Sequence, residues 1–144
     1  MHRPGSLLVV DDDKSLTAVV AELLHARGFE VWAAYDGLQG FTSYLAHPTQ
    51  FVITDIQMPE LNGIEMMRCI RAINPDVKTI YVSGGAERFH EDLEMEEQGF
   101  AAILLRKPFA SQDLIRLISD VPMTQPQYRM GKTSKRKLRQ TSEF

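Results

Sequence analysis

Residues 7–13 read LLVVDDD, four large apolar residues followed directly by three aspartates. A short apolar run that ends in charge is typical of a strand buried on both faces of a parallel sheet. Apolar side chains then recur at spacings of three and four residues from Leu16 to Leu24, which predicts an amphipathic helix. Gly28 follows where such a helix should end. The chain therefore opens with a strand, an acidic turn and a helix.

The same alternation recurs four more times in the first 120 residues. We expect further strands at 30–34, 51–54, 79–82 and 101–105, and helices at 38–46, 64–73, 88–98 and 112–119. Turn sequences such as Asn62-Gly63 separate them, and Ser111 is expected to cap the last helix. Strands joined by single helices need right-handed crossovers. The sequence thus predicts an α/β fold with a five-stranded parallel sheet and helices on both faces.

Composition excludes several classes of protein. The 144 residues are 44% apolar and 24% charged, which is ordinary for one globular domain. Cys69, the single cysteine, cannot form an internal disulfide, and we expect it to pack within its helix. No apolar run approaches the roughly 20 residues that cross a bilayer, and the N-terminus does not resemble a signal peptide. A cytoplasmic location is therefore expected.

Charge is distributed unevenly along the chain. Residues 121–144 carry six Lys and Arg against one Glu, a charge of +5, whereas residues 1–120 carry 10 basic and 18 acidic groups, a charge of −8. The end segment also contains two prolines and shows no helical periodicity. We expect a folded domain at 1–120 and a basic, disordered tail at 121–144.

Polar residues gather at the predicted strand ends. Asp11 and Asp12 follow the first strand, Asp55 the third, Ser83 the fourth and Lys107 the fifth. The carboxyl ends of parallel strands form one edge, where binding sites occur. Two like charges about 4 Å apart there cost roughly 4 kcal/mol, which a hard divalent ion such as Mg²⁺ would offset. A carboxylate nucleophile with a metal, a lysine and a hydroxyl suits phosphoryl transfer.

Each of these residues also has a structural explanation when it is taken alone. Asp11 and Asp12 could close a turn or cap the following helix, and Asp13 is expected to be such a cap. Serine ends many strands, and Lys107-Pro108 could lie in a solvated loop. The functional interpretation depends on the set and on its order in the chain.

The set resembles the receiver domain of bacterial two-component response regulators. The matching segments are LLVVDDD (7–13), FVITDIQMPELNG (51–63), YVSGG (81–85) and LLRKPF (104–109). The resemblance covers residues 6–120. It implies a flavodoxin-like, doubly wound sheet with strand order 2-1-3-4-5.

The resemblance also implies a role for each site residue. Asp55 would accept a phosphoryl group, Asp12 would bind Mg²⁺ directly, and Asp11 would act mainly through a metal-bound water. Gln57 would offer its backbone carbonyl to the metal. Ser83 would hydrogen-bond a phosphoryl oxygen.

In the same resemblance, Lys107 would pair with the phosphoryl group, after a cis bond to Pro108. The donor would be the phosphohistidine of a sensor histidine kinase or of a histidine phosphotransfer protein. The output would pass through the face formed by 88–98, 101–105 and 112–119, with a phosphorylation-dependent dimer as one form. No DNA-binding domain is expected in this sequence, so we expect either a stand-alone receiver or a piece of a larger regulator. One position departs from the family, because Leu104 stands where receivers usually carry Tyr or Phe.

Two alternatives compete with this interpretation. A haloacid-dehalogenase-like phosphatase would use Asp11 as nucleophile, with Asp11-x-Asp13 as its motif, but it would leave Asp55 unexplained. A receiver-like docking module would work without phosphate. We expect a switch that accepts a phosphoryl group and is not a turnover enzyme.

Overall fold

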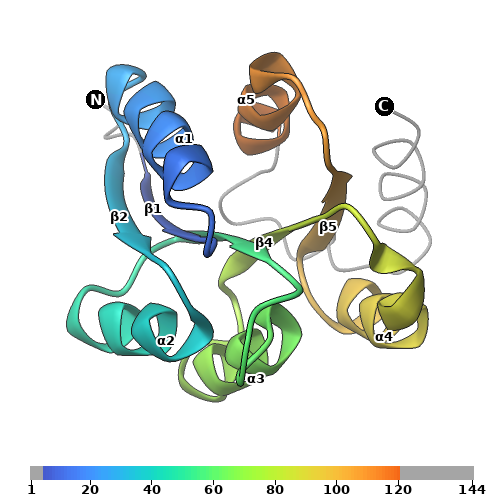
Figure 1. Ribbon diagram of the computed structural model, residues 1–144. Coiled ribbons are helices and arrows are strands. Elements are labelled where there is room, and N and C mark those ends of the chain that lie inside the picture. The colour runs from blue at the N-terminus through green and yellow to red at the C-terminus, as the bar shows by residue number, and fades with distance from the viewer. Residues whose placement is uncertain (1–4, 121–144) are drawn as a thin grey trace.

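The computed structural model describes residues 5–120, in which five parallel strands form one sheet with helices on both faces (Figure 1). The strands are β1 (Ser6–Val10), β2 (Glu30–Ala34), β3 (Phe51–Asp55), β4 (Lys78–Ser83) and β5 (Ala102–Arg106). The helices are α1 (Lys14–Ala26), α2 (Gly37–Ala46), α3 (Gly63–Ile73), α4 (His90–Gly99) and α5 (Ser111–Asp120), with a short 3₁₀ helix η1 (Ala86–Phe89) before α4. The strand order is β2-β1-β3-β4-β5, which confirms the predicted topology.

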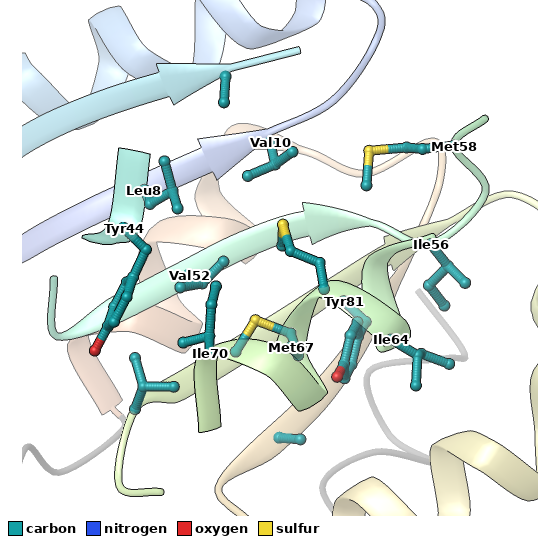
Figure 2. Packing of buried hydrophobic residues seen from close by; sticks show 14 of the residues in the cluster. Leu8, Val10, Tyr44, Val52, Ile56, Met58, Ile64, Met67, Ile70 and Tyr81 are labelled. Carbon is teal, nitrogen blue, oxygen red and sulfur yellow. The ribbon is translucent and has the colours of Figure 1, made fainter. Parts of the chain in front are cut away.

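The sheet divides the core into two layers. Helices α1 and α5 cover one face, and α2, α3 and α4 cover the other (Figure 1). Leu8, Val52 and Tyr81 project from the strands toward the second group of helices (Figure 2). Leu7 and Ile53 face the first group. Because both faces are covered, every residue of the inner strands β3 and β4 is buried, and the central residues of the inner strands (7–10, 51–53 and 80–82) are apolar.

The strands differ in how completely their residues are buried. Every residue of β3 and β4 is buried, whereas β2 lies at an edge and is only partly buried. Trp32 of β2 is half-buried and its ring stacks on the imidazole of His47, with the ring centroids 3.8 Å apart. The lower apolar content of the second strand thus goes with its partial exposure, whereas β5 at the other edge is almost wholly buried.

Helix ends follow the predicted chemistry. The Asp13 side chain accepts from the Leu16 N–H at 3.1 Å and caps α1. Gly28 has φ of 94°, a left-handed conformation that commonly ends helices. Glycine adopts it without steric strain because it has no Cβ. Asn62 and Glu65 form a reciprocal capping box at the start of α3.

Two local expectations were wrong. Ser111 is the first residue of α5 rather than its cap, and the Asp113 side chain accepts from the Ala110 N–H at 3.2 Å instead. Cys69 is exposed on α3. The predicted element bounds otherwise agree with the structure to within two residues. None of the helices among residues 5–120 has the length and apolar character needed to cross a membrane. The predicted tail at 121–144 lies outside the described residues.

Candidate functional site

The predicted polar residues meet at one edge of the sheet. Asp11 and Asp12 follow β1, Asp55 ends β3, Ser83 ends β4 and Lys107 follows β5. All five strands run in the same direction, so these carboxyl ends lie together. The topology therefore assembles the site from four separate stretches of sequence.

The acidic side chains converge closely. One carboxylate oxygen from each of Asp11, Asp12 and Asp55 lies within 4.8 Å of the other two. The Lys107 Nζ lies 3.0 Å from Asp11 Oδ2 and 3.6 Å from Asp55 Oδ2. Asp11 and Asp55 are buried, whereas Asp12 is exposed. We call Asp11, Asp12, Asp55 and Lys107 the acidic pocket.

Hydrogen bonds from the backbone and from Lys107 fix the orientation of Asp11. Its Oδ1 accepts from the Asp13 N–H at 2.9 Å, and its other oxygen accepts from Lys107. Thr17 of α1 donates its hydroxyl to the Asp11 carbonyl at 3.1 Å. The sequence gives no signal for Thr17, because a buried threonine in an amphipathic helix does not differ in pattern from a packing residue.

Burial changes the acidity of Asp55. Desolvation raises the pKa of its carboxyl group from 3.8 to about 6, and the charges of Asp11 and Asp12 act in the same direction, while the Lys107 charge and the Ile56 N–H oppose them. Burial lowers the pKa of Lys107, but its hydrogen bond to Asp11 and the Asp55 charge outweigh burial, so that its pKa lies above 10.5. Lys107 is therefore charged at neutral pH.

The remaining predicted residues lie at or just beyond the carboxyl ends of the strands. Ser83 is buried, and its Oγ accepts from the Gly85 N–H at 3.1 Å. The side chain of Gln57 is exposed in the loop after β3. A Cβ at Gly84 would contact only the Lys107 Cβ, at 3.9 Å. The Lys107–Pro108 peptide bond is cis.

Gly63, the first residue of α3, packs closely against the backbone of Asp55 and Ile56. Its N–H donates to the Ile56 carbonyl at 2.9 Å, and a Cβ at this position would lie 2.1 Å from the Asp55 carbonyl oxygen. We expect Gly63→Ala to lower the free energy of unfolding by about 2 kcal/mol, because the backbone of β3 or α3 must shift. Urea denaturation measures the loss.

Gly99 provides the matched control for this prediction. Nothing lies within 4 Å of a Cβ built there, and it is also a helical position. Gly99→Ala should change the stability by less than about 1 kcal/mol. Equal effects at Gly63 and Gly99 would contradict the close approach.

The donor set suits a hard cation. Carboxylate oxygens are the ligands that Mg²⁺ and Ca²⁺ prefer, and two buried acids beside a third create the repulsion that a divalent ion offsets. Three protein oxygens leave positions for water or for a phosphoryl oxygen. The acidic pocket is thus able to bind a metal ion.

Comparison with known proteins gives the family. The model of the response regulator receiver domain matches residues 7–119. The chain belongs to the receiver domain family. It is homologous to two-component regulators, and its acidic pocket is typical of the phosphoacceptor site of receivers. Receivers are not a classical enzyme family.

Curated relatives share this domain in different settings. The chain is 35% identical over 117 residues to the CpxR homolog of Haemophilus influenzae, a transcriptional regulatory protein, covering 81% of this chain and 50% of the relative. It is 29% identical over 113 residues to the response regulator receiver protein CpdR of Brucella abortus, covering 78% and 92%. It is 30% identical over 119 residues to the regulator DctD of Rhizobium meliloti, of which it spans 25%.

Solved structures agree with the fold. A response regulator receiver domain protein from Clostridium thermocellum is 32% identical with a TM-score of 0.70, covering 80% of this chain and 91% of the other. A CheY-like receiver protein from Methanospirillum hungatei is 25% identical with a TM-score of 0.74, covering 81% and 92%. These matches favour the receiver interpretation over the phosphatase alternative.

Proposed function

We propose that this receiver domain is a phosphorylation-dependent signalling switch in which Asp55 accepts the phosphoryl group. The observation that carries the proposal is the convergence of three carboxylates and Lys107 around Asp55. Asp55 is 8% exposed, at the end of a buried strand, and it faces the charged groups that a phosphoryl acceptor needs.

The other residues have assigned roles in this proposal. Asp12 and Asp55 would hold Mg²⁺ directly, Asp11 would act through a metal-bound water, and the Gln57 carbonyl would complete the protein ligands. Bound Mg²⁺ supplies positive charge that neutralises the phosphoryl oxygens. Lys107 neutralises a further oxygen.

The transfer follows from this arrangement. An Asp55 carboxylate oxygen attacks phosphorus, the P–N bond of a phosphohistidine breaks, and the imidazole leaves with the bonding electron pair. The Ser83 hydroxyl, which now accepts from the Gly85 N–H, turns to donate to a phosphoryl oxygen. Water later attacks phosphorus, the bond between phosphorus and the Asp55 oxygen breaks, and inorganic phosphate leaves, which restores the Asp55 carboxylate and resets the switch.

The wider setting is also part of the proposal. The donor is a sensor histidine kinase or a histidine phosphotransfer protein, in the cytoplasm. Residues 1–120 form the receiver domain, and residues 121–144 are a basic tail. Output passes through the face formed by α4, β5 and α5, and a phosphorylation-dependent dimer is one form of that output. Family membership, with a match over residues 7–119, supports the histidine kinase as donor.

An apolar groove beside the acidic pocket suits the donor protein. It has a volume of about 520 Å³ between α1 and α5, and Lys107 lines it as well as the pocket. Val19 of the groove is 60% exposed. A protein seated there would bring its phosphohistidine next to Asp55, so we assign the groove to the donor.

Val19→Asp tests this assignment. We expect it to slow phosphotransfer at least about tenfold from a phosphohistidine protein that labels the wild type, because a charge would be buried in the groove. Labelling by acetyl phosphate, which needs no docking, should not change. Leu38→Asp is the matched control, since Leu38 is 64% exposed and does not line the groove. A loss with acetyl phosphate as well would contradict the assignment.

The proposed function is tested by mapping the phosphorylated residue. The protein is incubated with acetyl phosphate and Mg²⁺, reduced with borohydride and digested, and the modified aspartate is identified by mass spectrometry. Modification of Asp55 is expected. Modification of Asp11 would support the phosphatase alternative, and no modification would support a docking module that works without phosphate.

A further inference from the structure

A second group of buried polar side chains lies between α3, β4 and α4. Arg71 of α3 donates through Nη1 to Glu96 Oε1 of α4, and the Tyr81 hydroxyl of β4 donates to the same oxygen. Arg71 Nη2 also donates to Thr79 Oγ1 at 2.7 Å. All four residues are at most 5% exposed. We call Arg71, Thr79, Tyr81 and Glu96 the α4 network.

The α4 network is a principal attachment of α4 to the rest of the domain. The buried residues of this helix are Leu93, Glu96 and Glu97, so charged side chains outnumber apolar ones. The ion pair between Arg68 of α3 and Asp92 of α4 joins side chains that are about half exposed, and such pairs contribute little. The position of α4 therefore depends on a few directional bonds rather than on a broad apolar contact.

Strand β4 connects this network to the phosphoacceptor site. Tyr81 and Ser83 are two residues apart in β4 and share one face of the strand. Ser83 Oγ accepts a hydrogen bond from the Gly85 N–H, and the chain then continues through η1 into α4. The end of β4 thus contacts α4 by two routes, through the loop that begins at Ser83 and through the bond from Tyr81 to Glu96.

Tyr81 also lies beside the position where this chain departs from its family. Tyr81 pairs with Leu104 of β5 in the sheet register, and both side chains are buried in the same core layer. Leu104 has no polar atom with which to contact α4. The aromatic hydroxyl that faces this helix comes from β4 instead of β5.

We propose that the α4 network is a latch that holds α4 in its resting position and opens when Asp55 carries a phosphoryl group. The latch rests on the proposed function, since it is the phosphoryl group that draws Ser83 inward. Packed elements of this kind move between discrete arrangements. Tyr81 and Glu96 are positioning residues, and weakening their bond favours the phosphorylated form by linkage.

Tyr81→Phe tests the latch, because it removes one hydroxyl and keeps the ring. We expect the apparent affinity for beryllofluoride with Mg²⁺, a mimic of the phosphoryl group, to rise at least about fivefold. In the free variant, the amide resonances of residues 90–99 should move toward their positions in the beryllofluoride-bound wild type. A purely structural role for Tyr81 would change neither quantity.

Tyr44→Phe is the matched control. Tyr44 of α2 is 1% exposed, and its hydroxyl accepts from Asn74 Nδ2 at 3.0 Å, away from α4. It should lose stability without any change in beryllofluoride affinity or in the resonances of residues 90–99. If wild type binds beryllofluoride and Tyr81→Phe behaves like Tyr44→Phe, the latch is wrong while the proposed function stands. If wild type does not bind beryllofluoride, both are wrong.

Discussion

Asp55→Asn is expected to reduce phosphoryl incorporation from acetyl phosphate by at least about 100-fold. An amide oxygen is a poor nucleophile compared with a carboxylate, and the substitution also removes the charge of one of the three carboxylates that converge in the acidic pocket. The fold should remain intact, since asparagine has nearly the same shape and β3 is held by its neighbours on both sides. Incorporation is measured with radiolabelled acetyl phosphate at fixed Mg²⁺ concentration.

Asp13→Asn is the matched control for this loss. Asp13 is the exposed cap of α1 and lies two residues from Asp11. Asparagine caps helices as well as aspartate does, so the fold should be unchanged. Labelling should stay within about threefold of wild type, since one exposed charge beside the pocket is screened by salt. Undiminished labelling of Asp55→Asn would count decisively against Asp55 as the acceptor.

Local patterns explain why most of the fold could be predicted from the sequence. Strands buried on both faces have apolar centres, and the expected strands at 7–10, 51–54 and 79–82 lead directly into Asp11, Asp55 and Ser83. Asp55 and Lys107 could be placed in one site because parallel strands share an edge. The strand order came from the resemblance to receivers, because periodicity alone does not order five strands.

Contacts between distant residues explain what the sequence did not show. The segment HEDLEMEEQG of α4 has the composition of a solvated helix, yet Glu96 is buried because Arg71, 25 residues earlier, pairs with it. The pairing of a buried charge is invisible until the fold brings its partner near. The close approach of Gly63 to the Asp55 carbonyl is likewise a contact between backbones. The sequence Asn62-Gly63 predicts a turn, but it does not predict this contact.

The stability of the metal-free protein should depend on pH through Asp55. Its pKa is about 6 in the folded protein, against an ordinary value of 3.8 for an aspartate in water, so the native state binds this proton more tightly than the unfolded chain does. The resulting stabilisation is fully present below pH 3.8 and is lost as the pH rises through about 6. This difference between the two pKa values corresponds to about 3 kcal/mol of stability in all.

Asp55→Asn removes this dependence, because an amide does not titrate. Between pH 4 and pH 8, the stability of the variant relative to wild type should therefore rise by about 2 to 3 kcal/mol, as measured by urea denaturation in the presence of EDTA. Added Mg²⁺ at pH 8 should reverse part of this difference, because the ion binds the native wild type in preference to the unfolded chain and has lost a ligand in the variant. A difference that is constant from pH 4 to pH 8 would show that burial does not raise the pKa of Asp55 in the folded protein. A difference that rises with pH but does not respond to Mg²⁺ would show that Asp55 has a raised pKa and that the carboxylates of the acidic pocket do not bind the ion.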